Sequence, residues 1–198
     1  MNKILITGGC GFIGSHIVEN FLSKKFVVTV VDLWKSPEIT KLEKKYQNLK
    51  VMNFNILDFE KLEKVIKENN YMIHMAAILG TLETITTYDI EEVVKTNVLG
   101  TTKILKIAKK YNLKIVEDAA CGFGSKIHEK HVGLFGDAGC FSFHPRKSIT
   151  TGEGGMITTQ SPEIAERLCR LRDHGATLTD LQRHLGPKPY LLSDHSDA

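Results

Sequence analysis

A glycine-rich turn near the amino terminus constrains the fold of this chain more than any other feature. The apolar run 4–7 predicts a strand, residues 8–14 (GGCGFIG) predict a turn, and residues 15–24 predict a helix. A second apolar run, 27–31, predicts another strand and ends at Asp32. In such a turn, glycines let backbone N–H groups approach a pyrophosphate, and the positive end of the helix favours the anion. The pattern predicts an α/β fold with a mainly parallel sheet that binds a dinucleotide.

The residue types in this turn suit distinct tasks. Gly9 and Gly11 permit tight turns and close approach of phosphates, whereas Gly14 lets the helix pack near the strand. The Asp32 carboxylate can accept hydrogen bonds from both ribose hydroxyls and would repel a 2′-phosphate, so NAD is favoured over NADP. The predicted cofactor-binding residues of the turn are Gly8, Gly11, Phe12, Ile13 and Gly14. The alternative is a flavodoxin-like sheet whose glycine-rich loop binds nothing.

Composition argues against several classes of protein. The net charge of +3 arises from interspersed lysine and glutamate, which indicates solvated helix faces rather than a nucleic-acid-binding surface. The four cysteines are widely spaced, with no Cys-x-x-Cys pair, which argues against a metal site or a disulfide framework and fits a reducing cytoplasm. The sequence contains no apolar run of the ~20 residues that a membrane span needs. We therefore expect a cytoplasmic protein without a metal, nucleic-acid or membrane partner.

The sequence up to residue 115 resembles a known family of NAD-dependent enzymes. Further strands are predicted at 50–56 and 71–77, with a helix at 61–69 between them. The glycine-rich turn, Asp32, the pair Asn55-Ile56 and the segments 74–77 (HMAA) and 96–101 (TNVLGT) resemble the extended short-chain dehydrogenase/reductase family. That family includes epimerases and dehydratases of nucleotide sugars.

This resemblance implies roles for five further residues. Asn55 and Ile56 would contact the adenine, although the family commonly has Asp at the first position. Ala76 and Ala77 would line the dinucleotide, and Asn97 would begin a helix that packs beside the site. His74 is interpreted as a packed histidine at a strand end rather than as a chemical group.

The catalytic Tyr-x-x-x-Lys motif of the family lies beyond the fifth strand, where this sequence changes character. The spacing occurs here from Tyr46 to Lys50, ahead of the third predicted strand, and we interpret it as accidental. The first half is therefore expected to bind NAD without transferring a hydride.

From Glu117 onward the sequence resembles a different family, the DegT-type sugar aminotransferases. These are pyridoxal-phosphate (PLP) enzymes with an aspartate-aminotransferase-like fold. The matching segments are 117–121 (EDAAC), 133–137 (GLFGD), 140–147 (CFSFHPRK), 150–156 (TTGEGGM) and 171–175 (LRDHG).

By this resemblance Lys147 is the catalytic residue, which would hold PLP as a Schiff base and then act as acid and base. Asp118 would be a buried carboxylate at the end of a strand that keeps the pyridine nitrogen protonated, and Ser142 would bind the cofactor phosphate. Cys121 stands where many relatives have Gln, and we expect it to be a small buried packing residue. His144 and Arg146 are assigned no catalytic role.

The two resemblances meet at residues 111–116 without a linker. We therefore expect a chimera of two incomplete parts: a Rossmann-like NAD-binding half at 1–115 and a partial aminotransferase large-domain segment at 116–198. Three functions stay open: an enzyme of nucleotide-sugar metabolism with the chemistry of either family, a non-catalytic NAD-binding module, and a truncated product without activity. A homodimer is also open, because aminotransferases of this type build their sites across two subunits.

Overall fold

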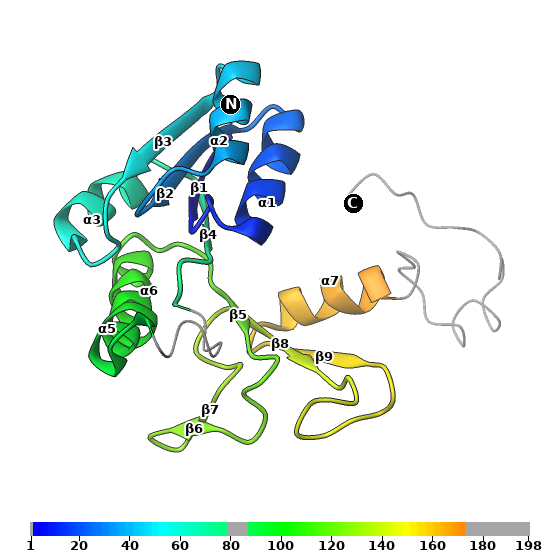
Figure 1. Cartoon of the computed structure of the whole chain (residues 1–198). Helices are drawn as coiled ribbons and strands as arrows, with labels where there is room; N and C mark the ends of the chain where they lie inside the picture. The colour runs from blue at the N-terminus through cyan, green and yellow to red at the C-terminus, as the bar shows by residue number, and fades with distance from the viewer. Residues whose placement is uncertain (1, 79–86, 173–198) are drawn as a thin grey trace, which may run out of the picture. The chain divides into compact units, whose positions relative to one another are not determined.

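The computed structural model of the chain describes residues 2–78 and 87–172 (Figure 1). The chain divides into two compact units, Met1–Leu113 and Lys114–Ala198. Each unit has its own sheet, and the two are described separately below.

The first unit contains a four-stranded parallel sheet with the order β3-β2-β1-β4. This is the order of the first four strands of a dinucleotide-binding fold, and it confirms the expected α/β class with a parallel sheet. Thr7 is in register with both Val31 and His74, so these strands end together at one edge. The strands are β1 (Lys3–Thr7), β2 (Val27–Asp32), β3 (Leu49–Asn53) and β4 (Tyr71–His74).

Helices cover both faces of this sheet (Figure 1). On one face lie α1 (Phe12–Ser23) and α2 (Pro37–Lys45), and on the other α3 (Phe59–Lys67) and α6 (Thr101–Lys110). The short helix α5 (Ile90–Val94) continues into α6 through a wider π-helical turn, η1 (Lys95–Gly100).

Two apolar clusters hold these layers together. The strand residues that alternate along β1 and β2 face opposite sides, so each helix pair has its own cluster. The cluster under α1 and α2 is built from Ile4, Ile6, Cys10, Val18, Leu22, Val28, Val30, Ile39 and Leu42. The cluster under α3 and α6 is built from Leu5, Val31, Ile56, Leu62, Val65, Ile66, Ile104 and Ile107.

Several predicted boundaries differ from the structure. The helix predicted from residue 15 begins at Phe12, so the end of the glycine-rich segment forms its first turn. The strands predicted to reach residues 56 and 77 end at Asn53 and His74. Asn97 does not begin a helix, because it lies within the π-helical turn that follows α5.

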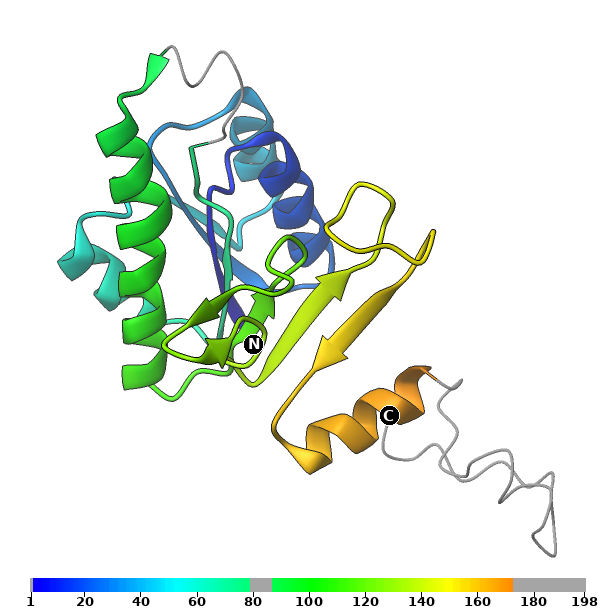
Figure 2. The same cartoon turned by 90° about the horizontal axis from the view of Figure 1, so that it is seen from below.

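The second unit has a three-stranded sheet with the order β5-β8-β9 (Figure 2). Strand β5 runs parallel to β8, and β9 runs antiparallel to it. A two-stranded hairpin, β6-β7, and helix α7 complete the described part of this unit. The elements are β5 (Val116–Asp118), β6 (Lys126–Ile127), β7 (Lys130–His131), β8 (Ala138–Ser142), β9 (Gly155–Thr158) and α7 (Pro162–Arg172).

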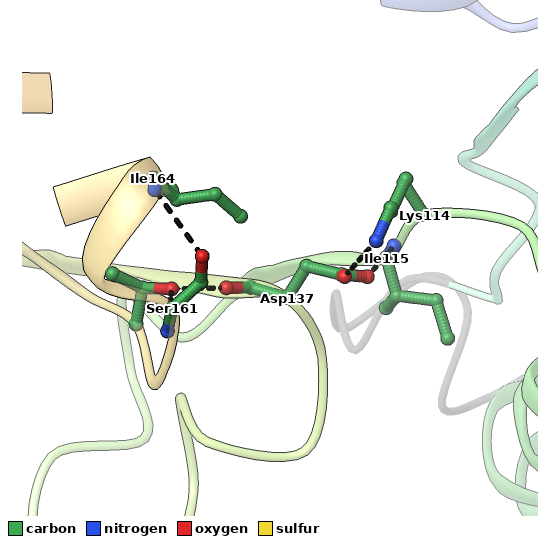
Figure 3. A network of polar contacts seen from close by, with 6 residues as sticks. Lys114, Ile115, Asp137, Ser161 and Ile164 are labelled. Atoms are coloured by element: carbon green, nitrogen blue, oxygen red, sulfur yellow. Dashed lines mark hydrogen bonds and ion pairs between the residues drawn. The ribbon is translucent and has the colours of Figure 1, made fainter. Parts of the chain in front are cut away.

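Polar contacts of Asp137 connect the start of the second unit to the segment before α7 (Figure 3). The Asp137 carboxylate accepts from the backbone N–H of Ile115 and from the Lys114 amine, both at 2.9 Å. The hydrogen bond with Lys114 is the main reason why the pKa of the Asp137 carboxyl is lowered. The backbone carbonyl of Asp137 accepts from Thr159 Oγ1 at 2.6 Å, and Ser161 caps α7 by accepting from the Ile164 N–H at 3.2 Å. One carboxylate therefore orders the entry to β5.

Candidate functional site

The glycine-rich turn lies at the carboxyl edge of the first sheet, between β1 and α1. Gly8 has a φ of +71° and donates its N–H to the Val31 carbonyl at 2.9 Å. A Cβ at Gly8 would lie 2.7 Å from the backbone nitrogen of Ala76. Both the conformation and the close approach of the segment that follows β4 therefore require glycine here.

The same turn exposes the amino end of α1. A Cβ at Gly14 would overlap the Gly8 carbonyl oxygen, so glycine lets the helix start against the turn. The N–H groups of Phe12, Ile13 and Gly14 belong to the first helical turn, where the helix offers no acceptor. Gly11 precedes them without a side chain to cap the helix, and the residue Phe12 is 84% exposed. This end of the helix suits an anion.

The Asp32 carboxylate is held directly beside this turn. Its Oδ2 accepts from the backbone N–H of Cys10 at 2.9 Å, and its Oδ1 accepts from the backbone N–H of Leu33 at 2.8 Å. Each oxygen keeps a further lone pair for a ribose hydroxyl. The Cys10 side chain is buried in the core, and burial raises the pKa of its thiol.

His74 joins three elements of the first unit. Its Nδ1 lies 2.7 Å from Thr7 Oγ1 on β1, and its Nε2 lies 3.0 Å from Thr101 Oγ1 on α6. Burial lowers the pKa of the imidazole. The interpretation of His74 as a packed strand-end histidine is therefore confirmed. The two threonine partners could not be predicted from sequence, because the three residues are far apart along the chain.

Asn97 clamps the segment that follows β4. Its side-chain amide accepts from the Ile78 N–H and donates to the Ile78 carbonyl, both at 2.8 Å. Ala76 and Ala77 directly precede Ile78, and the backbone of Ala76 lies close to Gly8 of the glycine-rich turn. The structure thus brings Asn97, both alanines and Gly8 to the same edge of the sheet.

Asn55 and Ile56 follow β3 at that edge as well. The Ile56 side chain is buried in the apolar core, which leaves only its backbone for a ligand. Asn55 is exposed, and its side-chain oxygen accepts from the Leu57 N–H at 2.9 Å. The Tyr46–Lys50 pair lies elsewhere, since Tyr46 follows α2 and Lys50 lies on β3 near the opposite, amino edge of the sheet.

The predicted residues of the second unit gather at the carboxyl ends of β5 and β8. Asp118 ends β5 in register with Cys140, and Ser142 ends β8 two residues further on. The Lys147 amine donates to Cys121 Sγ at 3.1 Å. Because Cys121 follows Asp118 by three residues, this contact brings the amine to the end of β5.

Two features of this second group differ from the predictions. Cys121 is exposed, so the expectation of a buried packing residue is wrong. Its exposure follows from a tight turn in which the Gly122 N–H bonds the Ala119 carbonyl at 2.9 Å. Asp118 is also exposed rather than buried, and its Oδ1 accepts from the Ala120 N–H at 3.1 Å.

The loop that carries Lys147 is fixed by its own backbone. The Lys147 N–H donates to the His144 carbonyl at 2.9 Å, and the Arg146 N–H donates to His144 Nδ1 at 3.2 Å. Ser142 Oγ accepts from the His144 N–H at 3.4 Å. Ser142 and Lys147 are thus linked through one short loop. Residues 173–175 of the last matching segment lie outside the described residues.

Within residues 2–78 and 87–172, no three His, Cys, Asp or Glu side chains are grouped so that they could hold a metal ion. In the same two ranges, every helix is too short or too polar to cross a lipid bilayer.

Comparison with known families settles the membership of the chain. The model of the DegT/DnrJ/EryC1/StrS aminotransferase family matches residues 56–188, which is more than half of the sequence. The chain belongs to this aminotransferase family. The family implies PLP as a cofactor, and the matched range begins within the first unit.

Individual relatives agree with both resemblances in the sequence. A UDP-N-acetyl-3-dehydro-alpha-D-glucosamine 3-aminotransferase of Acidithiobacillus ferrooxidans is 43% identical over 38% of this chain and 21% of its own length. A GDP-perosamine synthase of Escherichia coli O157:H7 is 45% identical over 37% of this chain and 20% of its own length. Among solved structures, the UDP-glucose 4-epimerase of Bifidobacterium longum, in complex with NAD+ and UDP, superposes with a TM-score of 0.52 at 30% identity.

The alignments are partial. That epimerase match covers 62% of this chain and 38% of the epimerase. The chain spans about a fifth of the length of the two curated relatives. The sequence is similar to nucleotide-sugar aminotransferases, and its fold is similar to that of an NAD-binding epimerase.

Proposed function

We propose that this chain serves nucleotide-sugar metabolism by binding NAD in its first unit and PLP through Lys147 in its second. The proposal assigns residues 1–115 to a dinucleotide-binding domain and residues 116–198 to an aminotransferase-like segment. Its support is the family membership, together with relatives whose names describe enzymes of nucleotide sugars. A cytoplasmic location and a homodimer belong to the same proposal.

The hydrogen bond between Asp32 and the Cys10 N–H carries the NAD assignment. It holds an acidic group beside the uncapped amino end of α1, so one site offers acceptors for ribose hydroxyls and N–H donors for phosphates. Gly8, Gly11, Phe12, Ile13 and Gly14 would face the pyrophosphate. The adenine would lie along Asn55 and the backbone of Ile56, and the other end of NAD along Ala76, Ala77 and Asn97.

Calorimetric titration with NAD tests this site. Replacing Asp32 with Ala removes a charged acceptor, and a hydrogen bond to a charged group contributes about 1.5–3 kcal/mol. The affinity for NAD should therefore fall by roughly 10- to 100-fold. Glu19→Ala is the matched control, since this carboxylate pairs with Lys45 on the surface of α1. Equal affinities for NAD in Asp32→Ala and the parent chain would show that the ribose contact is wrong.

The contact of Lys147 with Cys121 carries the PLP assignment, because it brings an amine to the strand end that bears Asp118. When bound, PLP supplies an electron sink for the carbon that bears the amino group. Lys147 would bind the cofactor covalently and afterwards move a proton at its Nζ. Ser142 would bind the phosphate, and Asp118 would hold a proton on the pyridine nitrogen. Since Asp118 is exposed, its effect is expected to be weaker than that of a buried carboxylate.

Borohydride reduction in the presence of PLP tests Lys147. Peptide mapping should find the reduced cofactor on Lys147, and Lys147→Arg should lose it. Lys126→Arg, a change on the exposed β6-β7 hairpin, is the control and should leave the labelling unchanged. Label spread over many surface lysines, with Lys147 unmodified, would overturn the assignment.

A second candidate function is NAD binding without turnover. It is favoured by the position of Tyr46 and Lys50 near the amino edge of the sheet, away from the edge that carries Asp32 and the glycine-rich turn. Incubation with NAD and UDP-glucose should then give neither NADH nor an epimerised sugar, although NAD binds. Formation of either product would contradict this candidate.

A further inference from the structure

The Cys121 thiol lies in contact with Lys147, the residue proposed to bind PLP, so oxidation of the thiol would affect this lysine. Cys121 Sγ lies 3.1 Å from Lys147 Nζ, and Cys121 is an exposed residue. The PLP site as proposed above uses Lys147 but gives the thiol no task. The inference below rests on that proposed function.

The four cysteines of the chain differ in their surroundings. Cys10 is buried, and burial raises the pKa of its thiol, so an oxidant reaches it poorly. Cys140 is half-buried on β8. Cys169 is exposed on α7 and therefore serves as a comparison for solvent access alone. Cys121 combines solvent access with a lysine amine in hydrogen-bond contact.

The position of both groups is fixed by backbone contacts. The turn from Ala119 to Gly122 presents Cys121 at the end of β5, and the bond from the Lys147 N–H to the His144 carbonyl fixes the loop on the other side. Bond formation between sulfur and nitrogen therefore needs only a short movement of two side-chain ends.

We propose that Cys121 and Lys147 form a peroxide-sensitive pair that becomes joined by a sulfur–nitrogen bond. A peroxide first oxidises the thiol to a sulfenic acid, with transfer of one oxygen to sulfur and release of water from hydrogen peroxide. The Lys147 amine gives up a proton to water, and the lone pair of its nitrogen then attacks this sulfur. The sulfur–oxygen bond breaks, and the hydroxide leaves as water with a proton from the nitrogen. The product is a sulfenamide with two hydrogens fewer than the separate side chains.

The sulfur–nitrogen bond blocks the amine that would bind PLP. The cross-linked nitrogen has no free amine with which to bind the cofactor carbonyl, so loading of PLP stops while the bond persists. A reducing dithiol reverses it, because its two thiols become a disulfide and their hydrogens restore the Cys121 thiol and the Lys147 amine. Through this pair, peroxide would lower the fraction of the chain that can bind PLP, and a reductant would restore it.

The test treats the full chain, free of PLP, with hydrogen peroxide and divides the sample. One part is digested and analysed by mass spectrometry. The other is incubated with PLP and reduced with borohydride, and each variant is compared with its own untreated sample. Cys121→Ser removes the sulfur, Lys147→Gln removes the amine, and Cys169→Ser is the control with an intact pair.

We expect the parent chain and Cys169→Ser to yield a linked pair of peptides that contains Cys121 and Lys147, lighter than their sum by two hydrogens and absent after dithiothreitol. Capture of PLP should fall in proportion to the linked fraction and recover with the reductant. In Cys121→Ser, peroxide should neither produce the linked peptides nor lower the capture of PLP. The proposal is overturned if Lys147 stays free while Cys121 is oxidised alone or joined to another cysteine. Failure of the untreated parent chain to capture PLP would instead count against the proposed function, since the linked peptides are detected without PLP.

Discussion

Replacing Gly8 with Ala tests how the glycine-rich turn is held. The new methyl group would occupy a left-handed conformation with φ of +71°, which costs about 1–2 kcal/mol for a residue other than glycine. The methyl would also lie 2.7 Å from the Ala76 nitrogen, and overpacking of this kind costs about 1–3 kcal/mol. A smaller unfolded-state entropy offsets about 0.4–1 kcal/mol. We expect the free energy of unfolding to fall by about 1–5 kcal/mol in total.

Gly11→Ala is the matched control within the same turn. Gly11 has a φ of −70° and a ψ of 172°, which any residue adopts, and the nearest atom to an added Cβ is the Gly8 oxygen at 3.3 Å. Its stability should change by less than about 1 kcal/mol. The affinity for NAD should nevertheless fall, because the methyl occupies the side from which phosphates approach.

Urea denaturation measures both effects on stability. Trp34 is the one tryptophan of the chain and lies two residues after β2, so its fluorescence reports on the first unit. The urea midpoint of Gly8→Ala should fall well below that of Gly11→Ala, with similar m-values. Equal midpoints for the two variants would contradict the requirement for glycine at residue 8, which rests on its conformation and on the close approach of Ala76.

Three further predictions follow from single side chains. Because burial lowers the pKa of His74, the folded state binds fewer protons than the unfolded state below pH ~6.5. The contribution of neutral His74 to stability is thus complete above that pH and is lost as the pH falls towards the lowered pKa. In urea titrations at a series of pH values, the free energy of unfolding of His74→Gln should fall less steeply with decreasing pH than that of the parent chain. An equal pH dependence in the two proteins would contradict this. Asn97→Ala leaves both backbone groups of Ile78 unpaired and should cost about 1–3 kcal/mol, measured by urea denaturation, whereas a loss below ~0.5 kcal/mol would show that the clamp is dispensable. Glu117→Ala removes a carboxylate that accepts from two glycine N–H groups of the second unit, at 2.8 and 2.5 Å, and hydrogen exchange at those amides should accelerate more than in Glu117→Gln. Identical exchange in the two variants would argue against the role of the charge.

The first unit was largely predictable because local sequence and tertiary packing agree there. Apolar runs, the glycines and Asp32 indicated two strands, a turn and a helix, and all of these are present. Strand ends were predicted less well, since a strand ends where its neighbour ends. Strand β4 stops at His74 because β1, its partner, stops at Thr7, and β3 stops at Asn53 opposite the last residue of β2.

The contacts of the candidate site depend on residues that are distant in sequence. The spacing of these residues along the sequence does not predict that His74 contacts Thr7 and Thr101. It also does not predict that Asn97 binds the backbone of Ile78. A free cysteine is usually buried, which predicted a buried Cys121, but the turn after β5 leaves this residue exposed. A local signal does mark the start of α5 ahead of Asn97, because Asp89 is followed by two acidic residues in the first helical turn.

Native mass spectrometry of the full chain, incubated with NAD and PLP and then reduced with borohydride, tests the central claim that one chain holds both cofactors. The account predicts a species that carries a single covalent PLP on Lys147 and a single dissociable NAD. It also predicts that Asp32→Ala loses the NAD alone and that Lys147→Arg loses the PLP alone. A parent chain that retains neither cofactor, or variants that lose both together, would contradict it.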